Sequence, residues 1–312
     1  MSNPYPFGSP AMPPINIQNN LEKRLVGIAY SGGGDRVVIE LGVVQAFIEL
    51  GIVPDLIAGV SAGGFAGVFH ALDPRSTQYI QLAMKSAAEA LPLLRPSRFA
   101  DIFRLLPAGL EVLFFGTGAL HLQSILSNKR VRKLLERRLP VKTFGELRVP
   151  LSVAATNLLN GGETWFSDPQ MQLVPALLAS AAIPILFPPV EINGQQYVDG
   201  SVADNLPLVR LAQMGCSVIY ACNVGYAGEA NKPPVNLIDT ALQSVSIGQY
   251  TAELRQELLL RAMYPEIKVI PVRPQVELAT LPSAINPRDV PRYVAEAAAE
   301  TKRILTQVGA TA

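Results

Sequence analysis

The 312-residue sequence is poor in histidine, cysteine and tryptophan, with two, two and one of each. Cys216 and Cys222 are too few for a disulfide framework or a four-ligand zinc site, so packing in a reducing compartment is their expected role. Charged residues make up only 16% and nearly cancel, because the formal net charge is +1. This balance gives no general electrostatic surface for nucleic acid, and we expect no such partner. The hydrophobic fraction of 49% predicts an apolar globular protein.

The sequence also has no evident signal peptide or transmembrane span. Its first 20 residues carry five prolines and lack a basic start followed by an apolar run. We therefore expect an extended, proline-rich tail over residues 1–22, followed by one domain over residues 23–312. Residues 169–190 contain no charged residue, but prolines interrupt them, so a buried helix and turn are predicted there. These features favour a cytoplasmic protein with peripheral membrane contact.

Short apolar runs alternate with stretches of helical periodicity, which is typical of an α/β domain with a mostly parallel sheet. Strands are predicted at 25–30, 55–60, 151–156, 163–167, 197–198, 217–223 and 267–272. Helices are predicted at 37–50, 62–72, 77–90, 122–138, 174–182, 237–263 and 291–308.

The stretch from Phe99 to Leu126 is rich in phenylalanine, leucine, glycine and proline and has few charges. One interpretation is a helical subdomain packed on the sheet. The other is an apolar lid or lipid-facing surface, because exposed apolar patches mark interaction sites.

Residues Gly59-Val60-Ser61-Ala62-Gly63 form a Gly-x-Ser-x-Gly motif where a predicted strand ends and a helix begins. A nucleophile on such a sharp turn needs small neighbours, because larger side chains would clash with adjacent backbone. The helix that follows directs its N-terminal amides and dipole at the site, which favours developing negative charge. Ser61 is therefore the candidate nucleophile.

Three glycines, Gly32, Gly33 and Gly34, follow the first predicted strand and precede Asp35 and Arg36. Successive glycines allow backbone N–H groups to turn toward a bound oxygen, as an oxyanion hole requires. The competing interpretation is a nucleotide-binding loop. However, the spacing matches neither Gly-x-Gly-x-x-Gly nor the P-loop motif.

Asp199-Gly200 at the end of another predicted strand is either a plain turn or the site of a catalytic acid. A Ser–Asp–His triad is the first arrangement to test, but no histidine follows position 121. His70 falls about two turns into the helix after Ser61 and should pack away from it, and His121 is expected to be solvated or to cap a helix. The base must then be another group, and a buried carboxylate with a raised pKa can serve.

Taken together and in this order, the glycine loop Ser31–Arg36, the motif at Gly59–Gly63 and Asp199-Gly200 resemble the patatin-like phospholipases. The resemblance runs from about Leu25 to Val272 and includes Ala155-Thr156-Asn157 and the segment Ala179-Ser180-Ala181-Ala182-Ile183-Pro184.

The resemblance implies a three-layer α/β/α fold and a Ser–Asp dyad. Ser61 would be the nucleophile and Asp199 the base, with Gly32, Gly33 and Gly34 as the oxyanion hole. Arg36, Gly59, Gly63 and Gly200 would support the loops. Family members hydrolyse acyl esters of phospholipids, lysophospholipids and neutral lipids without calcium or another cofactor, so we expect a lipid substrate, transient membrane contact and no cofactor.

The sequence departs from the family pattern at Asp35 and Val37, where small residues are common, and at Ser201, where glycine or alanine usually follows Asp-Gly. An acid beside the loop could oppose an oxyanion or pair with Arg36. Two alternatives to a lipid hydrolase therefore remain. One is a lipid- or membrane-binding protein with weak catalysis, and the other is an acyltransferase that uses the same dyad.

Overall fold

The computed structural model describes residues 24–94, 124, 126–225, 233–234, 237–277 and 285–309. Within these residues the chain folds around one eight-stranded mixed sheet, in which β3, β2, β1, β7 and β8 lie side by side in this order and run parallel to one another. β4, β5 and β6 pair antiparallel. The strands are β1 (Leu25–Tyr30), β2 (Leu56–Val60), β3 (Leu151–Asn157), β4 (Glu163–Phe166), β5 (Val190–Ile192), β6 (Gln195–Asp199), β7 (Cys216–Cys222) and β8 (Lys268–Val272).

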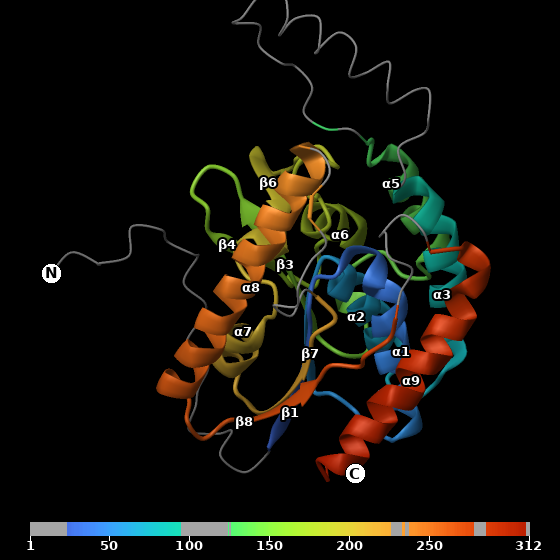
Figure 1. Cartoon of the computed structure of the whole chain (residues 1–312), viewed down its shortest axis with the longest axis vertical. Coiled ribbons are helices and arrows are strands. Elements are labelled where there is room, and N and C mark those ends of the chain that lie inside the picture. Colours follow the sequence, from blue (N-terminus) through green and yellow to red (C-terminus); the bar gives the residue numbers. More distant parts are fainter. Residues whose placement is uncertain are drawn as a thin grey trace, which may run out of the picture.

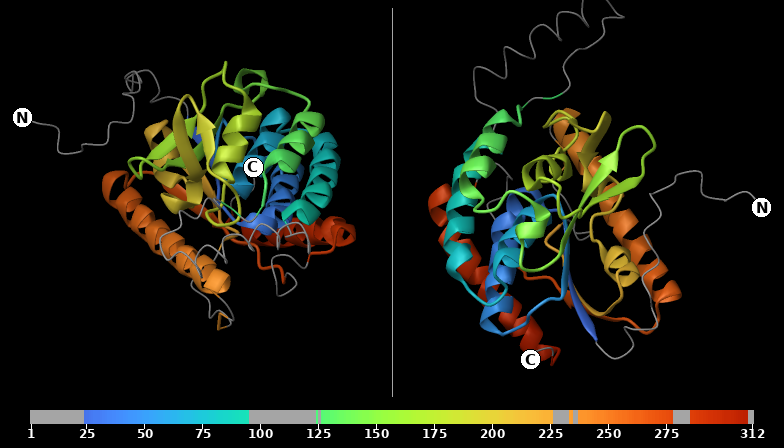
Figure 2. Two further views of the ribbon diagram at one scale, coloured as in Figure 1. Left: turned by 90° about the horizontal axis from the view of Figure 1, so that it is seen from above. Right: turned by 180° about the vertical axis from the view of Figure 1, so that it is seen from behind.

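Helices cover both faces of this sheet, which gives a three-layer α/β/α arrangement (Figures 1 and 2). One face carries α1 (Val37–Glu49), α2 (Ala62–Leu72), α3 (Gln78–Ala90), α5 (Lys129–Arg138), α6 (Leu173–Ser180) and α9 (Val290–Gln307). The other face carries α7 (Leu208–Gln213) and the long α8 (Leu237–Met263). Short 3₁₀ helices are η2 (Gly34–Arg36), η3 (Leu91–Leu94), η4 (Phe144–Glu146), η5 (Gly200–Val202) and η7 (Pro287–Asp289).

Each layer of helices has its own apolar core. Alternate residues of β1 show this division, because Ile28 and Tyr30 belong to the larger core under α1 and α2, whereas Ala29 belongs to the smaller core under α7 and α8. Both faces of the parallel strands are therefore buried, which explains their continuous apolar runs.

The register of β3 brings the ends of β2 and β6 together. Val60, the last residue of β2, pairs with Ala154, and Asp199, the last residue of β6, pairs with Ala155. β4 pairs with β3 over Val153–Thr156, which overlaps both of these pairings. β4 must therefore take the opposite edge of β3, so β2 and β6 occupy successive segments of one edge. The residue that follows β2 is Ser61, and the register thus places it beside Asp199.

Most of the predicted elements are confirmed within one or two residues, and α2 and α8 have the predicted bounds. The helix predicted from residue 122 is wrong at its start. Among described residues it begins at Lys129, because Leu126 instead turns into the core, where its N–H donates to the Leu186 carbonyl at 2.8 Å. β5 and α7 were not predicted, since three and six residues are too few for a clear periodic pattern.

The buried helix predicted within residues 169–190 is α6, whose residues Leu173, Ala176 and Leu177 have no exposed surface. No helix in the described parts of the chain is both long enough and apolar enough to cross a membrane. The predicted tail over residues 1–22, nearly all of the apolar stretch 99–126 and His121 lie outside the described residues.

Candidate active site

Ser61 lies on a tight turn between β2 and α2 and has the left-handed backbone dihedral φ of 50°. This conformation is strained for a residue with a side chain. It is imposed by close contact of strand and helix, because a Cβ on Gly59 would lie 2.5 Å from the Gly63 carbonyl oxygen. A Cβ on Gly63 would likewise lie 2.4 Å from the Tyr30 carbonyl oxygen. Both glycines of the motif are thus required by the backbone, as in a nucleophile elbow.

A buried hydrogen bond holds the turn. The Ser61 N–H donates to Ser180 Oγ at 2.8 Å, and Ser180 is the fully buried last residue of α6. Ser180 was not among the predicted site residues. The sequence feature that could have indicated its role is the Ala-Ser-Ala-Ala-Ile-Pro segment, on which the family resemblance partly rests.

Asp199 lies at the end of β6 and its backbone is fixed from two sides. Its N–H donates to the Ala182 carbonyl at 3.0 Å, and its own carbonyl accepts from Thr156 Oγ1 at 2.9 Å. Gly200 allows β3 to approach, because a Cβ there would lie 2.5 Å from the Ala154 carbonyl oxygen. These contacts therefore fix the Asp199 backbone, and with it the carboxylate, beside the Ser61 turn.

The Asp199 carboxylate is 1% exposed and is surrounded by hydrogen-bond donors. Its Oδ1 accepts from the Ser201 N–H at 2.9 Å and from Ser201 Oγ at 2.6 Å, and the Ser61 side chain is a further neighbour that lowers the pKa of the carboxyl group. Burial raises the pKa of Asp199 to about 6, while the hydrogen bonds from Ser201 and Ser61 oppose that rise. At neutral pH the group is mostly ionised and is a stronger base than an exposed aspartate.

The glycine loop packs directly against both serines of this site. A Cβ on Gly32 would lie 3.2 Å from Ser201 Cβ and 3.6 Å from Ser61 Cβ. The Gly32 N–H already donates to the Asn205 carbonyl at 3.1 Å. The N–H groups of Gly33 and Gly34 make no hydrogen bond to another described residue, so these two are the candidates for oxyanion donors. Gly34 has a φ of 59°, which a residue with a side chain rarely adopts.

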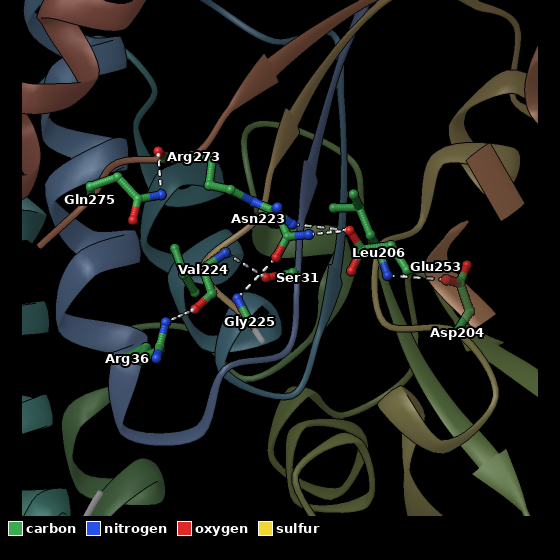
Figure 3. A network of polar contacts seen from close by, with 10 residues as sticks. All are labelled: Ser31, Arg36, Asp204, Leu206, Asn223, Val224, Gly225, Glu253, Arg273 and Gln275. Atoms are coloured by element: carbon green, nitrogen blue, oxygen red, sulfur yellow. Dashed lines mark hydrogen bonds and ion pairs between the residues drawn. The ribbon is translucent and has the colours of Figure 1, made fainter. Parts of the chain in front are cut away.

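Contacts with the segment after β7 hold the glycine loop (Figure 3). Ser31 Oγ accepts from the Val224 N–H at 3.0 Å, and Arg36 Nη1 donates to the Val224 carbonyl at 3.1 Å. Arg36 therefore supports the loop and does not form an ion pair with Asp35 among the described residues. The same segment continues through Asn223, whose side-chain amide donates to Glu253 of α8.

Asp35 follows the glycines directly, and its Oδ2 is buried without a hydrogen-bond partner. Burial raises the pKa of its carboxyl group to about 7, although the charge of Arg36 and nearby backbone N–H groups act in the opposite direction. An ionised carboxylate here would oppose negative charge on a neighbouring oxyanion.

His70 and the two cysteines lie in the interior of the described structure. His70 is fully buried, its Nδ1 is 2.9 Å from the Tyr30 hydroxyl oxygen, and its ring stacks on Phe47. Burial lowers the pKa of His70 to about 3, so it is neutral and packed away from Ser61, as predicted. Cys216 and Cys222 are buried free thiols.

Fold and site together define an α/β protein whose serine stands on a strained strand–helix turn beside a buried carboxylate and a glycine loop. The family model described as "Patatin-like phospholipase" matches residues 28–212, which is more than half of the chain. The chain therefore belongs to the patatin-like phospholipase family.

Two curated relatives and one solved structure illustrate the similarity. The chain is 29% identical over 221 residues to lysophospholipase NTE1 of Saccharomyces cerevisiae, covering 69% of this chain and 12% of that protein. It is 30% identical over 230 residues to an uncharacterized NTE family protein of Mycobacterium tuberculosis, covering 73% and 57%. It thus spans only part of the length of these relatives. VipD from Legionella pneumophila matches with a TM-score of 0.47 at 18% identity, covering 91% of this chain and 67% of that one.

Proposed function

We propose that the protein hydrolyses carboxylic esters of lipids, as a phospholipase A or lysophospholipase, through an acyl-serine intermediate on Ser61. The observation that carries this proposal is the placement of Ser61, on a strained strand–helix turn, beside the buried Asp199 carboxylate by the register of β3. The glycine loop packed against Ser61 and the family membership add support.

In the proposed first step, Ser61 Oγ attacks the ester carbonyl carbon while Asp199 accepts the serine proton. The developing oxyanion is held by the N–H groups of Gly33 and Gly34, and the N-terminus of α2 adds a favourable dipole. Collapse of this intermediate breaks the ester bond, and the alcohol leaves with the proton from Asp199. In the second step Asp199 takes a proton from water, which attacks the carbonyl carbon of the acyl-serine. The bond from that carbon to Ser61 Oγ then breaks, Ser61 recovers the proton from Asp199, and the fatty acid is released.

The pKa of Asp199 fixes the direction of the pH dependence. The base works only when it is ionised, and its pKa is about 6. Activity should therefore fall as the pH is lowered through about 6.

Transient contact with an anionic lipid surface is part of the same proposal and rests on the basic face of α5. Lys129, Arg130 and Lys133 are exposed and form no ion pair with another described residue, whereas Val131 and Leu134 of the same helix are buried. Leu126, just before α5, is bonded to the loop that follows α6, the helix whose last residue holds the Ser61 turn. The segment before α5 is thus bonded to the loop that follows α6, and clustered basic residues on a helix favour anionic membranes.

The test is hydrolysis of a medium-chain p-nitrophenyl ester, and of micellar phospholipid and lysophospholipid, by the protein and its Ser61→Ala and Asp199→Asn variants. Ser76→Ala, beyond the far end of α2, is the matched control. We expect a loss of about a thousandfold or more in both site variants, and no change in the control. Equal rates for Ser61→Ala and the unmodified protein would refute the proposal. Product analysis with an added lysolipid acceptor would reveal acyl transfer.

A further inference from the structure

The hydroxyl of Ser201 makes a contact that a Ser–Asp dyad does not by itself require. It donates to Asp199 Oδ1 at 2.6 Å, beside the Ser201 N–H, which donates to the same oxygen at 2.9 Å. Glycine or alanine at this position would provide only the backbone donor, so the second donor depends on the Ser201 side chain.

A second residue determines the direction of that hydroxyl. Gln249 Nε2, on α8, donates to Ser201 Oγ at 2.7 Å, across 48 positions of sequence. A serine hydroxyl carries one proton and two lone pairs. Because the glutamine amide occupies a lone pair as a donor, the Ser201 proton is left to point at Asp199.

We propose that Ser201 and Gln249 are positioning residues that hold Asp199 in the orientation in which its carboxylate accepts the Ser61 hydroxyl. Two donors from Ser201 fix Oδ1 and stop the carboxylate from rotating. The inference rests on the proposed function, since it concerns the same base. It implies that α8, through Gln249, helps to orient Asp199, although α8 lies on the opposite face of the sheet from α2 (Figure 1).

The groups around Asp199 support a direct effect of the Ser201 hydroxyl on the pKa of Asp199. Burial raises its pKa and the Ser201 hydrogen bonds are the largest opposing influence. The acidic groups of neighbouring elements are Asp204 after η5, Glu163 of β4 and Glu253 of α8, and the charges of Glu163 and Glu253 raise the pKa of Asp204. None of them is among the causes of the Asp199 pKa shift, so removing the hydroxyl should act on the base without a competing charge.

The experiment is the pH dependence of kcat/KM, with kcat and KM separated, for Ser201→Ala, Gln249→Leu and the double variant. Gln256→Leu is the matched control, because it lies two turns further along α8 and its amide contacts Glu163 instead. Unfolding midpoints verify that each variant is folded. We expect Ser201→Ala to move the acid limb upward by about one pH unit and to lower kcat more than it raises KM. Gln249→Leu should move the limb in the same direction by less.

The double variant shows whether Gln249 acts on Asp199 through Ser201 or independently of it. If Gln249 acts through the Ser201 hydroxyl, the double variant should shift the limb no further than Ser201→Ala alone. An unmoved limb in Ser201→Ala, with activity still abolished by Ser61→Ala, would overturn this inference and leave the proposed function intact. Activity that survives Ser61→Ala would overturn both. If Ser201→Ala does not fold, a Gln249→Leu limb equal to that of Gln256→Leu would also overturn the inference.

Discussion

Replacing Ser180 by alanine tests whether the strained Ser61 turn is held by the hydrogen bond from its backbone. The Ser61 N–H donates to Ser180 Oγ at 2.8 Å, and the two residues are 4% and 0% exposed. Ser180→Ala would leave this buried N–H without its partner, which costs about 1–3 kcal/mol. If that cost falls on the nucleophile geometry, kcat/KM should drop about 5- to 150-fold.

The assay compares kcat/KM on a soluble short-chain ester with the urea midpoint of unfolding. Ser152→Ala is the matched control, because Ser152 is equally buried but its hydroxyl contacts only Met214 Sδ, at 3.7 Å. The control should lose little stability and no activity. The reasoning would be refuted if Ser180→Ala and Ser152→Ala had kcat/KM values within about twofold of each other.

Two further predictions concern the charges near the site. The carboxyl group of Asp35, with a pKa of about 7, ionises as the pH rises, so activity should decline above about 7 and Asp35→Asn should remove that decline. An unchanged alkaline limb in the pH profile of kcat/KM would contradict this role. Lys133→Glu on α5 should weaken sedimentation with anionic vesicles about tenfold, whereas Lys268→Glu, an equally exposed cation on β8, should not. Equal weakening in both would mean that only the net charge matters.

Much of the candidate site could be predicted from the sequence because its requirements are local. Gly59 and Gly63 flank Ser61 at a spacing that only a tight strand–helix turn needs, and the structure shows backbone atoms where their side chains would lie. This requirement needs only the chemistry of neighbouring residues. The absence of a histidine after position 121 indicates another base, and the family resemblance implies that this base is Asp199.

The rest depends on contacts between distant segments, which no local pattern encodes. Ser180 bonds to Ser61 across 119 positions, and Gln249 bonds to Ser201 across 48. The hydrogen bond from the Gly32 N–H to the Asn205 carbonyl likewise depends on the packing of two loops. The sequence predicts Gly32, Gly33 and Gly34 as oxyanion glycines, whereas among the described residues the N–H of Gly32 has a partner and those of Gly33 and Gly34 have none.

Burial alone does not decide what a carboxyl group does at this site. Asp35 and Asp199 are both largely removed from water, and burial raises the pKa of each. Asp199 Oδ1 receives hydrogen bonds from the backbone and side chain of Ser201, whereas Asp35 Oδ2 receives none from the described residues. Asp199 with a pKa of about 6 thus ionises before Asp35 with a pKa of about 7. Between these values the base is charged while the acid beside the oxyanion loop is largely neutral, and the proposed reaction should be fastest there.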